Sequence, residues 1–377
     1  VLVCPTAALH EKHNITEVQE YLNKQDIVKT IQYSPLVASG VAEELGIKYN
    51  RDFDRNLNSM LRKIGFDRVY ATGTGTDVCI NELTGQLSEK IRKKDPGPLF
   101  ITACPAWVKY AEQFMPHLIP KLSTVKSPQQ ITGILIKTVV ASQLDLKPEQ
   151  IFSVSVSPCI AMKYEARRDG MMRKGISDVD SVMTVRELAK LIRLNGIDVT
   201  NVDKEPADEP LSGRSSSALL AEVSGGLAEA VVRLLHYKTE GGDIDRQLLK
   251  KLRLSGSFRE CSVMIGETEM KVAVVDGLAG LEKLDSYQSA GARYDLVEVM
   301  TCQGGCIHGA GLPFISSKED LKNRARLAYQ ADETEAINLP CKSPSLINLY
   351  EKLLKENKEF SDKQIFYTHF EKRNVLL

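Results

Sequence analysis

The chain of 377 residues predicts an α/β fold in two lobes, with mainly parallel sheets flanked by helices. Three observations support this prediction. Strand-like apolar runs alternate with helical patterns, as they do in parallel sheets. Several of these runs end in loops of small residues. The length also exceeds what one small core needs, so we expect two packed units.

Six runs are interpreted as strands with the loops that follow them. They span residues 26–35, 68–77, 98–107, 151–159, 271–280 and 294–306. Helical periodicity lies between them, as in SGVAEELGIK after the first run and QQITGILIKTVVASQL before the fourth. In open α/β sheets, ligands bind beyond the carboxyl ends of the strands. The loops after these strands are therefore where we expect functional side chains.

A polar stretch, TNVDKEPADEPLSGRSSS at residues 200–217, combines charge, proline and serine, which is typical of a connection between lobes. We therefore assign residues 18–199 to a first lobe. Residues 200–377 form the predicted second lobe together with a C-terminal segment that packs back onto the fold. Within that segment, residues 343–370 predict one helix plus a tail. Residues 1–17 stand apart from both lobes.

Composition and charge narrow the class of protein. Apolar residues make up 43% of the chain and charged residues 26%, as expected of a soluble globular protein. The formal net charge is zero, so the totals favour neither nucleic acid nor an anionic membrane as a partner. No run of about 18 apolar residues predicts a transmembrane helix. The N-terminal stretch lacks the pattern of a secretory signal peptide, and we expect a cytoplasmic protein.

Cysteines are dispersed along the chain, at positions 4, 79, 104, 159, 261, 302, 306 and 341. In a large chain this dispersal indicates metal ligation or buried thiols more than disulfides. Three of them, Cys104, Cys159 and Cys302, follow predicted strands. If those strands run the same way, their loops meet at one edge of the fold although the sequence separates them widely.

The stretch CQGGCIHGAG, residues 302–311, places Cys306 shortly after Cys302 with glycines between and after them. Glycine lets the backbone approach a bulky ligand and adopt positive φ. A zinc knuckle would need a second nearby pair of ligands, which the sequence lacks. Four thiolates from distant loops suit an iron–sulfur cluster, whereas isolated cysteines are also common as small buried hydrophobes. Both interpretations stay open on the pattern alone. Buried thiols are expected at three other positions: Cys79, Cys261 and Cys341.

Three segments together resemble the signature loops of the iron-only, or [FeFe], hydrogenases. TACPAW, SPCIAMKYE and EVMTCQGGCIHGAG are similar to the family patterns T-S-C-C-P-x-W, M-P-C-x-x-K-x-x-E and E-x-M-x-C-x-G-G-C-x-x-G-G-G, in the same order. KSPQQ, SGGLAEA and the C-terminal LYEKLL region are also similar. The resemblance covers nearly the whole chain. It implies a hydrogenase domain with its active site between two lobes.

The N-terminal VLVCPTAAL resembles the end of a bacterial ferredoxin run, C-x2-C-x2-C-x3-C-P, of which Cys4 is the one cysteine present. We therefore interpret residues 1–17 as the remnant of a ferredoxin-like iron–sulfur domain within a larger protein. Cys4 is expected to bind no cluster here. The upstream iron–sulfur domain, or a separate electron-transfer protein, would be the electron partner of the active site.

In this family the active site is the H-cluster, a [4Fe–4S] cubane joined through one cysteine to a diiron unit with CO, cyanide and a bridging dithiolate amine. The resemblance implies four cubane ligands, Cys104, Cys159, Cys302 and Cys306, with Cys306 bridging to the diiron unit. It also implies H2 and protons as substrates and maturation proteins as partners. Without those, the chain would carry the cubane alone or no cluster. The cofactor supplies the chemistry, and the protein supplies orientation, electrostatics and proton delivery.

At the positions expected to lie beside the diiron unit, this chain has some of the family's residues and lacks others. The resemblance implies that four residues border it: Ser34, Pro35, Gln129 and Met300. Met162 falls where the family has a lysine, whose ammonium donates a charge-assisted hydrogen bond to cyanide. A methionine cannot donate one. Lys163 follows one position later and would reach the cyanide only if the loop shifts.

The proton route departs further from the family. Ala103 stands where a second cysteine, next to the ligating one, normally carries protons to and from the bridging amine. A methyl group can neither donate nor accept a proton. Farther along the relay, Gln86 and Leu83 align with glutamate positions, and neither titrates in the useful range. Ser123 matches the serine of the relay, and Ser157 replaces the methionine of the second loop.

Three functional interpretations follow. The departures favour a slow hydrogenase that interconverts protons and H2 and acts as a hydrogen sensor, because a proton relay contributes about 10²–10⁴-fold to turnover. The first alternative is a fast hydrogenase with a different proton route, through water, Ser157 or another titratable group. The second is a non-enzymatic iron–sulfur protein, similar to the eukaryotic assembly paralogs and holding only cubanes. The intact Cys306 in its glycine-rich loop argues against that second alternative.

Overall fold

A computed structural model describes residues 6, 8, 11–50, 52–253, 255–289, 291–315, 317–353 and 363–375. Cys4, and with it most of the predicted ferredoxin-like remnant before residue 11, lies outside the described residues. Within them, the strands form two four-stranded sheets and one two-stranded sheet. Most pairings in the two larger sheets are parallel. The predicted α/β architecture is therefore confirmed.

The first sheet has the strand order β2-β1-β4-β7 and is parallel throughout. Its strands are β1 (Val28–Tyr33), β2 (Arg68–Ala71), β4 (Ile151–Ser157) and β7 (Ser181–Thr184). The central strand β4 is buried along its whole length, including Ser153 and Ser155. Its alternation of apolar residues with serine does not mark a solvent face, because helices cover both faces of a parallel sheet.

The second sheet has the order β3-β10-β9-β8. Its strands are β3 (Leu99–Phe100), β8 (Phe258–Ile265), β9 (Thr268–Asp276) and β10 (Leu296–Met300). The edge strand β8 runs antiparallel to β9 and alternates between buried and exposed side chains. Although β3 falls within residues 18–199, it pairs with β10, and the Leu99 N–H donates to the Asp295 carbonyl at 2.8 Å. The predicted division at residue 200 therefore does not hold for this strand.

The helices are α1 (Ile15–Leu22), α2 (Pro35–Glu44), α3 (Phe53–Ile64), α4 (Gly73–Arg92), α5 (Pro105–Phe114), α6 (Pro128–Leu135), α7 (Ala141–Gln143), α8 (Ala161–Glu165), α9 (Val185–Leu194), α10 (Ser217–Leu220), α11 (Gly226–Glu240), α12 (Gly280–Ser289), α13 (Lys318–Thr334) and α14 (Pro344–Asn348). A π-helical segment, Ile136–Val140, joins α6 to α7. Two short strands, β5 (Met172–Arg173) and β6 (Ile176–Ser177), form the small sheet. No helix in the described part of the chain is long and apolar enough to cross a membrane.

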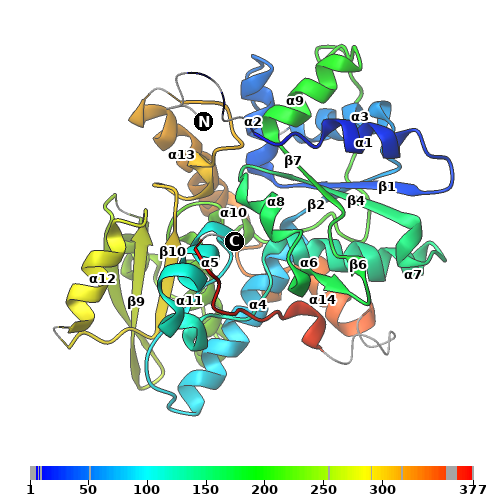
Figure 1. Ribbon diagram of the computed structural model, residues 1–377. Coiled ribbons are helices and arrows are strands. Elements are labelled where there is room, and N and C mark those ends of the chain that lie inside the picture. The colour runs from blue at the N-terminus through cyan, green and yellow to red at the C-terminus, as the bar shows by residue number, and fades with distance from the viewer. Residues whose placement is uncertain are drawn as a thin grey trace.

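Helices separate and cover the two sheets (Figure 1). Between the sheets lie α4, α6 and α11, which share one apolar core with both. The outer face of the first sheet packs against α2, α3 and α9, and that of the second against α5 and α12. Strand β9 shows the division, because Val272 and Val274 join the shared core whereas Ala273 and Val275 join the outer one. The carboxyl ends of both sheets border the middle of the molecule.

Short turns carry the chain from strand ends into helices. Four of the described α-helices start with a proline directly after the capping residue, and three of them, α2, α5 and α6, do so in the pairs Ser34-Pro35, Cys104-Pro105 and Ser127-Pro128. Proline suits the first helical position because the N–H that it lacks would have no partner there. The hydroxyls of Ser34 and Ser127 each accept a backbone N–H at 3.4 Å. These turns hold the N-termini of α2, α5 and α6 at the edges of the sheets.

Residues 366–368 of the C-terminal segment are hydrogen-bonded to the segment before α6. The Lys126 N–H donates to the Phe366 carbonyl at 2.8 Å, and the Thr368 N–H donates to the Thr124 carbonyl at 2.7 Å. The predicted helix in residues 343–370 is short, because α14 passes into a π-helical turn, Leu349–Leu353. Residues 354–362 lie outside the described residues.

Helix α9 offers a matched test of the outer core. Leu188 is fully buried, whereas Leu194 on the same helix is 59% exposed. The substitution Leu188→Ala should lower the free energy of unfolding by about 2–5 kcal/mol, because it removes buried methyl groups and leaves a cavity. The control Leu194→Ala should change it by less than about 0.5 kcal/mol. Urea unfolding measures both, and equal losses would contradict this packing.

Candidate metal centre

Four cysteines gather where the carboxyl ends of the two sheets meet. Cys104 follows β3, Cys159 follows β4, and Cys302 and Cys306 follow β10. Burial, followed by Cys104 and Cys302, raises the pKa of the Cys159 thiol to about 12. The pKa of Cys306 is raised well above its usual value by burial and then by neighbours that include the other three cysteines. The structure thus brings the four predicted ligands within electrostatic reach of one another.

These cysteines do not form a site for one metal ion. Among the described residues, no group of three His, Cys, Asp or Glu side chains is arranged to hold a single ion. A tetrahedral zinc site would require its ligands to converge on one point. In a [4Fe–4S] cluster each thiolate binds a different iron atom, so the ligands surround a larger volume. The arrangement suits a cluster better than a single ion.

Glycines in the third loop allow a close backbone approach. Gly304 and Gly305 have φ values of 84° and 87°, in the left-handed region that favours glycine. A Cβ atom on Gly305 would lie 2.5 Å from the backbone nitrogen of Ser224. The Ser224 N–H donates to the Gly304 carbonyl at 2.9 Å, and the Gly304 N–H donates to Asp276 Oδ1 at 2.7 Å. The loop that carries Cys302 and Cys306 is therefore fixed against α11 and β9.

A second set of glycine contacts joins the third loop to the second. The Gly311 N–H donates to the Pro158 carbonyl at 2.8 Å. A Cβ on Gly309 would lie 2.2 Å from the same carbonyl oxygen, so a larger residue there would separate the loops. Ala310 is exposed between them, which explains why this departure from three glycines leaves the contact intact. Cys159 and Cys306 are held together by this contact.

Hydroxyl groups accompany two of the cysteines. Cys104 Sγ lies 3.0 Å from Thr301 Oγ1. Ser157, which replaces the methionine of the second loop, accepts the Cys159 N–H at 3.1 Å. Ser157 therefore shapes the turn before Cys159. Its own hydroxyl hydrogen is not used by that bond.

A cavity of about 80 Å³, called the inner cavity below, lies beside Cys306. Eight of the predicted positions line it: Ser34, Pro35, Ala103, Gln129, Ser157, Met162, Met300 and Cys306. The first turns of α2, α4 and α6 also reach it, through Pro35, Gly73 and Pro128. Helix N-termini carry partial positive charge and favour anionic ligands such as cyanide.

The amide of Gln129 gives a direct test of whether the implied diiron unit fits. Its Oε1 is buried and has no hydrogen-bond partner among the described residues, while its Nε2 lies 3.4 Å from the Met162 carbonyl and from Glu165 Oε2. A buried polar atom without a partner costs about 1–3 kcal/mol. The cavity thus suits an anionic metal group with polar ligands. Gln129 Oε1 is without a partner among the described residues, helix N-termini border the cavity, and Cys306 supplies a thiol.

Lys163 does not reach this cavity. Its Nζ donates to Glu187 Oε2 and to the Lys12 carbonyl, both at 2.7 Å, and Lys163 is not among the residues that line the cavity. Met162 occupies the cavity wall instead. An ammonium is therefore missing from the position where the family supplies one to a cyanide ligand.

Ser123 and Gln86, two positions of the predicted relay, are joined by a hydrogen bond, and neither has a titratable group in the useful range. Ser123 Oγ donates to Gln86 Oε1 at 2.6 Å, and Gln86 Nε2 donates to Thr124 Oγ1 at 2.8 Å. Leu83 is buried. Ala103 lines the inner cavity, and its methyl group packs against the shared core. Neither an amide nor a methyl group can pass a proton on by titrating.

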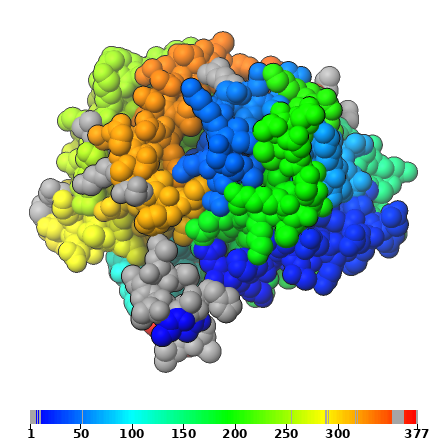
Figure 2. Space-filling view, turned by 90° about the horizontal axis from the view of Figure 1, so that it is seen from above, coloured from blue at the N-terminus to red at the C-terminus, as the bar shows by residue number. Residues whose placement is uncertain are grey.

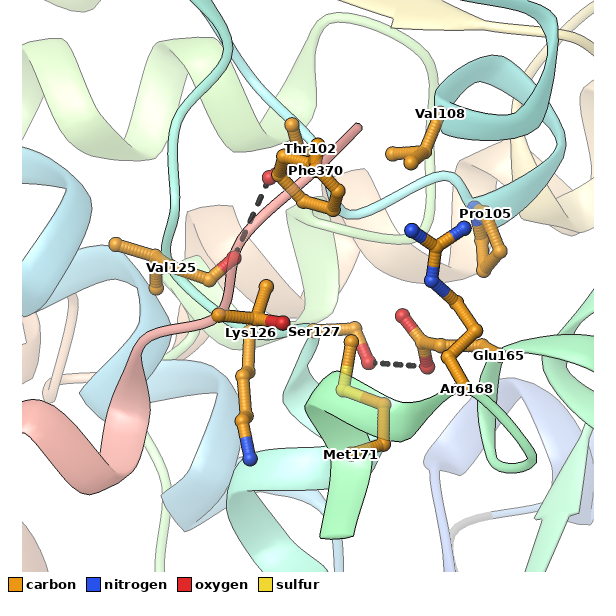
Figure 3. Close-up of a pocket in the computed structure, with 11 residues that line it drawn as sticks. Thr102, Pro105, Val108, Val125, Lys126, Ser127, Glu165, Arg168, Met171 and Phe370 are labelled. Carbon is orange, nitrogen blue, oxygen red and sulfur yellow. Dashed lines mark hydrogen bonds between the residues drawn. The ribbon is translucent and has the colours of Figure 1, made fainter. Parts of the chain in front are cut away.

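Sequence reasoning missed the role of Glu165, the last residue of the second signature segment. It is buried and accepts hydrogen bonds from Ser127 Oγ at 2.7 Å and Gln130 Nε2 at 3.3 Å, and burial raises its pKa to about 7. Figure 3 shows Glu165 in a small neighbouring pocket with Ser127, Arg168 and Phe370. It fastens α8 to α6 beside the inner cavity. Its place in the quoted motif was the available signal.

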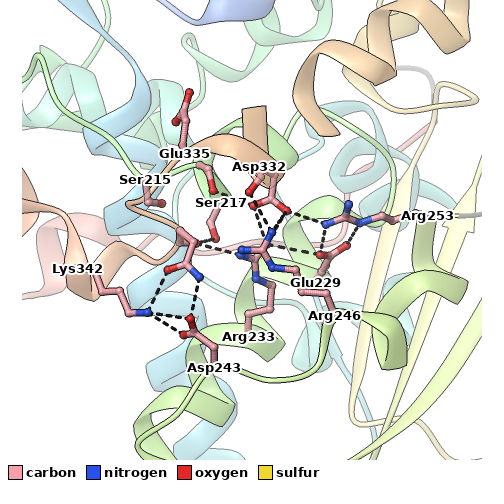
Figure 4. A network of polar contacts seen from close by, with 12 residues as sticks. Ser215, Ser217, Glu229, Arg233, Asp243, Arg246, Arg253, Asp332, Glu335 and Lys342 are labelled. Carbon is pink, nitrogen blue, oxygen red and sulfur yellow. Dashed lines mark hydrogen bonds and ion pairs between the residues drawn. The ribbon is translucent and has the colours of Figure 1, made fainter. Parts of the chain in front are cut away.

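Glu222 and Arg214, which also line the inner cavity, were missed because isolated charged residues carry no sequence signal. Arg214 Nη1 donates to Glu335 Oε2 at 2.6 Å. A neighbouring ionic network ties α11 to α13 (Figure 4), with Arg233 Nη1 at 2.9 Å from Asp332 Oδ1. The network fixes the segment around α10 that forms one wall of the cavity.

Comparison with known proteins decides the family. Residues 28–310 match the family described as "Iron only hydrogenase large subunit, C-terminal domain". The chain belongs to this family. The apo [FeFe]-hydrogenase HydA1 from Chlamydomonas reinhardtii has a similar structure, with a TM-score of 0.84 and 25% identity over 97% of this chain and 100% of that one. This similarity confirms the predicted hydrogenase-type architecture.

Curated relatives include both hydrogenases and assembly factors. The NADP-reducing hydrogenase subunit HndD of Solidesulfovibrio fructosivorans is 34% identical over 100% of this chain and 66% of its own length. Iron hydrogenase 1 of Clostridium pasteurianum is 32% identical over 92% of this chain and 62% of its own length. The chain thus spans less than two thirds of these relatives. The cytosolic Fe-S cluster assembly factor narfl of Danio rerio is 28% identical over 91% of this chain and 86% of its own length.

The contact between the second and third loops can be tested through cluster content. Gly309→Ala should place a Cβ against the Pro158 carbonyl, move Cys306 away from Cys159 and reduce the iron retained after anaerobic reconstitution with iron and sulfide. The control Ala310→Ser changes an exposed side chain and should retain the iron content of the original chain. Iron analysis and electron paramagnetic resonance measure both. Equal cluster content in the two variants would contradict the proposed ligand arrangement.

Proposed function

We propose that this chain is the H-cluster domain of a slow [FeFe] hydrogenase that interconverts protons and H2 and acts as a hydrogen sensor. The observation that carries the proposal is the wall of the inner cavity. It keeps Cys306 and the positions expected to border the diiron unit, but it has Ala103 where a proton carrier would stand. Such a site would keep H2 binding and lose fast proton exchange.

The four gathered cysteines would hold a [4Fe–4S] cluster, with Cys306 shared with a diiron unit bearing CO, cyanide and a bridging dithiolate amine. When bound, this cofactor supplies the reversible reduction of protons to H2. The protein's own residues do the rest. The N-termini of α2 and α6 and the Gln129 amide orient polar ligands. The buried side chain of Met300 excludes water from the same cavity.

Slow turnover follows from the residues that replace the usual relay. General acid–base groups contribute about 10²–10⁴-fold to a rate, and Ala103 and Gln86 remove two of them. Met162 further removes a hydrogen-bond donor from the cavity. Binding of H2 requires none of these groups. A site that binds H2 but lacks these groups suits a protein that detects H2 better than one that consumes it. This agrees with the sensory group of the family.

Partners and location are part of the same proposal. We propose an electron-transfer protein or upstream iron–sulfur domains as electron partner, with maturation proteins to insert the diiron unit, and a cytoplasmic location. One relative is named as a subunit of an NADP-reducing hydrogenase, which supports the proposal that this chain acts within a larger assembly. The balanced charge of the chain and the described helices give no support to nucleic acid or a membrane as a partner.

A cubane-only assembly protein is the second candidate, because relatives named as cytosolic Fe-S cluster assembly factors match most of the chain. The inner cavity argues against this candidate, because Cys306 and Gln129 line it and Gln129 Oε1 has no hydrogen-bond partner among the described residues. A protein that held only the cubane would have no use for that polar space.

Infrared spectroscopy separates these two candidates. Protein reconstituted with iron and sulfide and then given a synthetic diiron precursor should show CO and cyanide bands, because Cys306 and the inner cavity would retain the unit. Cys306→Ala should abolish those bands, whereas Cys261→Ala, which changes a buried thiol of β8, should keep them. Absence of the bands in the original protein would favour the cubane-only candidate.

Restoring a thiol should speed the reaction. Ala103→Cys should raise H2 evolution by about tenfold, less than the full effect of a relay because Gln86 still interrupts it. Adding Gln86→Glu should raise the rate further. Ala103→Ser is the control, since a hydroxyl titrates far above neutral pH and should give little gain. If Ala103→Cys and the double variant both keep the original rate, Ala103 does not limit proton transfer.

A further inference from the structure

One carboxyl side chain, that of Glu222, borders two cavities. The inner cavity lies on one side of it. A second cavity of about 260 Å³, called the outer cavity below, lies on the other side and is walled by α2 and α13. Both cavities are also lined by Pro35, Arg214 and Leu219. Glu222 therefore stands in the partition between them, in the turn from α10 to α11.

Elimination points to Glu222 within the inner cavity. Among the described residues that line it, three side chains can carry a charge: Arg214, Glu222 and Cys306. A guanidinium does not deprotonate in proteins. Cys306 is committed to iron in the proposed function. Glu222 is left as the side chain that can both release and accept a proton next to the proposed diiron unit.

The surroundings of Glu222 suit this task. Burial raises the pKa of its carboxyl group to about 7, and the Ser34 hydroxyl, the Leu36 N–H and the Arg214 cation oppose that rise. Cys306 lines the same cavity, and the charge of Glu222 is among the causes that raise the pKa of its thiol. An acid or base is most effective when its pKa lies near the working pH.

The outer cavity reaches the protein surface. Leu327, one of its lining residues, is 42% exposed. Figure 2 shows the surface where α13 meets α2, and these helices are joined there by the Arg324–Glu43 ion pair at 2.8 Å. Asp54 lines the same cavity, and burial raises its pKa to about 6. Five further polar or charged residues line the cavity: Ser39, Tyr49, Arg324, Gln330 and Glu335.

We propose that Glu222 carries protons between the outer cavity and the inner cavity, in place of the route that Ala103 interrupts. The proposal rests on the proposed hydrogenase function. During proton reduction, the Glu222 carboxylic acid releases its proton into the inner cavity, and the resulting carboxylate takes a proton from water in the outer cavity. H2 oxidation reverses both transfers. One O–H bond breaks and one forms in each cycle, and no electrons pass through Glu222.

A purely structural role for Glu222 must be distinguished from proton transfer. Its carboxylate accepts hydrogen bonds at the start of α2, from Ser34 and Leu36. Glu222→Gln keeps an oxygen that can accept both bonds and removes the exchangeable acid. Glu222→Asp keeps the acid on a shorter side chain. The pair therefore separates loss of the helix cap from loss of the proton carrier.

With the diiron unit loaded, Glu222→Gln should lower H2 evolution by about 10²-fold or more and remove the inflection of the rate near neutral pH. Glu222→Asp should retain part of both. The CO and cyanide infrared bands should stay the same in the two variants, which shows that the cluster is intact. An unchanged rate and pH profile in Glu222→Gln overturns the proposal. Missing bands in the original protein instead overturn the proposed function.

Proton exchange at Glu222 can also be measured in the cluster-free protein, without measuring H2 evolution. Infrared difference spectra taken below and above neutral pH should contain a carboxyl C=O band that is lost in Glu222→Gln. The control Asp77→Asn removes another buried carboxyl, with a pKa also raised to about 7 by burial, which lines neither cavity. It should leave the Glu222 band in place. Spectra that do not differ between the original protein and Glu222→Gln contradict proton exchange at this site.

Blocking the outer cavity tests the route with Glu222 intact. Ala328 on α13 lines the outer cavity, whereas Ala325, three residues earlier, lines a different cavity of about 1140 Å³. Both are partly buried. Ala328→Phe should slow H2 evolution and leave the CO and cyanide bands unchanged, while Ala325→Phe should preserve the rate. If the two variants turn over equally fast, protons do not enter through the outer cavity, and the proposal fails even where Glu222→Gln does not fold.

Discussion

The close backbone contact between the third loop and its neighbours is the constraint on which the rest of the site depends. Gly305 lies against the backbone of Ser224, and Gly309 lies against the Pro158 carbonyl, at separations that leave no room for a Cβ. Through these contacts, loops from both sheets are held at fixed positions relative to one another. The two sheets alone would place the loops near each other but would not set the spacing of the cysteines.

The same contacts create the two cavities and the partition between them. The turn that carries Glu222 continues into Val223, which pairs with Gly305, so the loop that positions Cys306 also positions the carboxyl group. The pairing of Val223 with Gly305 thus helps to set the positions of both Cys306 and Glu222. Glu222 also lines the outer cavity, which Ala103 does not, so a proton route through Glu222 would leave the four cysteines in place.

Sequence patterns predicted the architecture and the convergence of the loops that carry Cys104, Cys159 and Cys302, because strand ends have local signals, whereas the set of four cysteines was implied by the resemblance to the hydrogenases. They did not predict that β3 belongs to the second sheet, since that depends on pairing with β10 far along the chain. The position of Lys163 was left open, and its contact with Glu187 lies outside the reach of a local motif. Glu222 could not be found at all, because its importance comes from two cavities that exist only in the folded chain.

The central claim is that this domain holds an intact cluster site whose turnover is limited by proton supply. The solvent deuterium isotope effect on H2 evolution by the loaded protein, at saturating electron donor, tests it most directly. Turnover should be slower in D2O than in H2O, and the difference should be smaller in Ala103→Cys, where proton transfer no longer limits the rate. Equal rates in D2O and H2O for the original protein would contradict it.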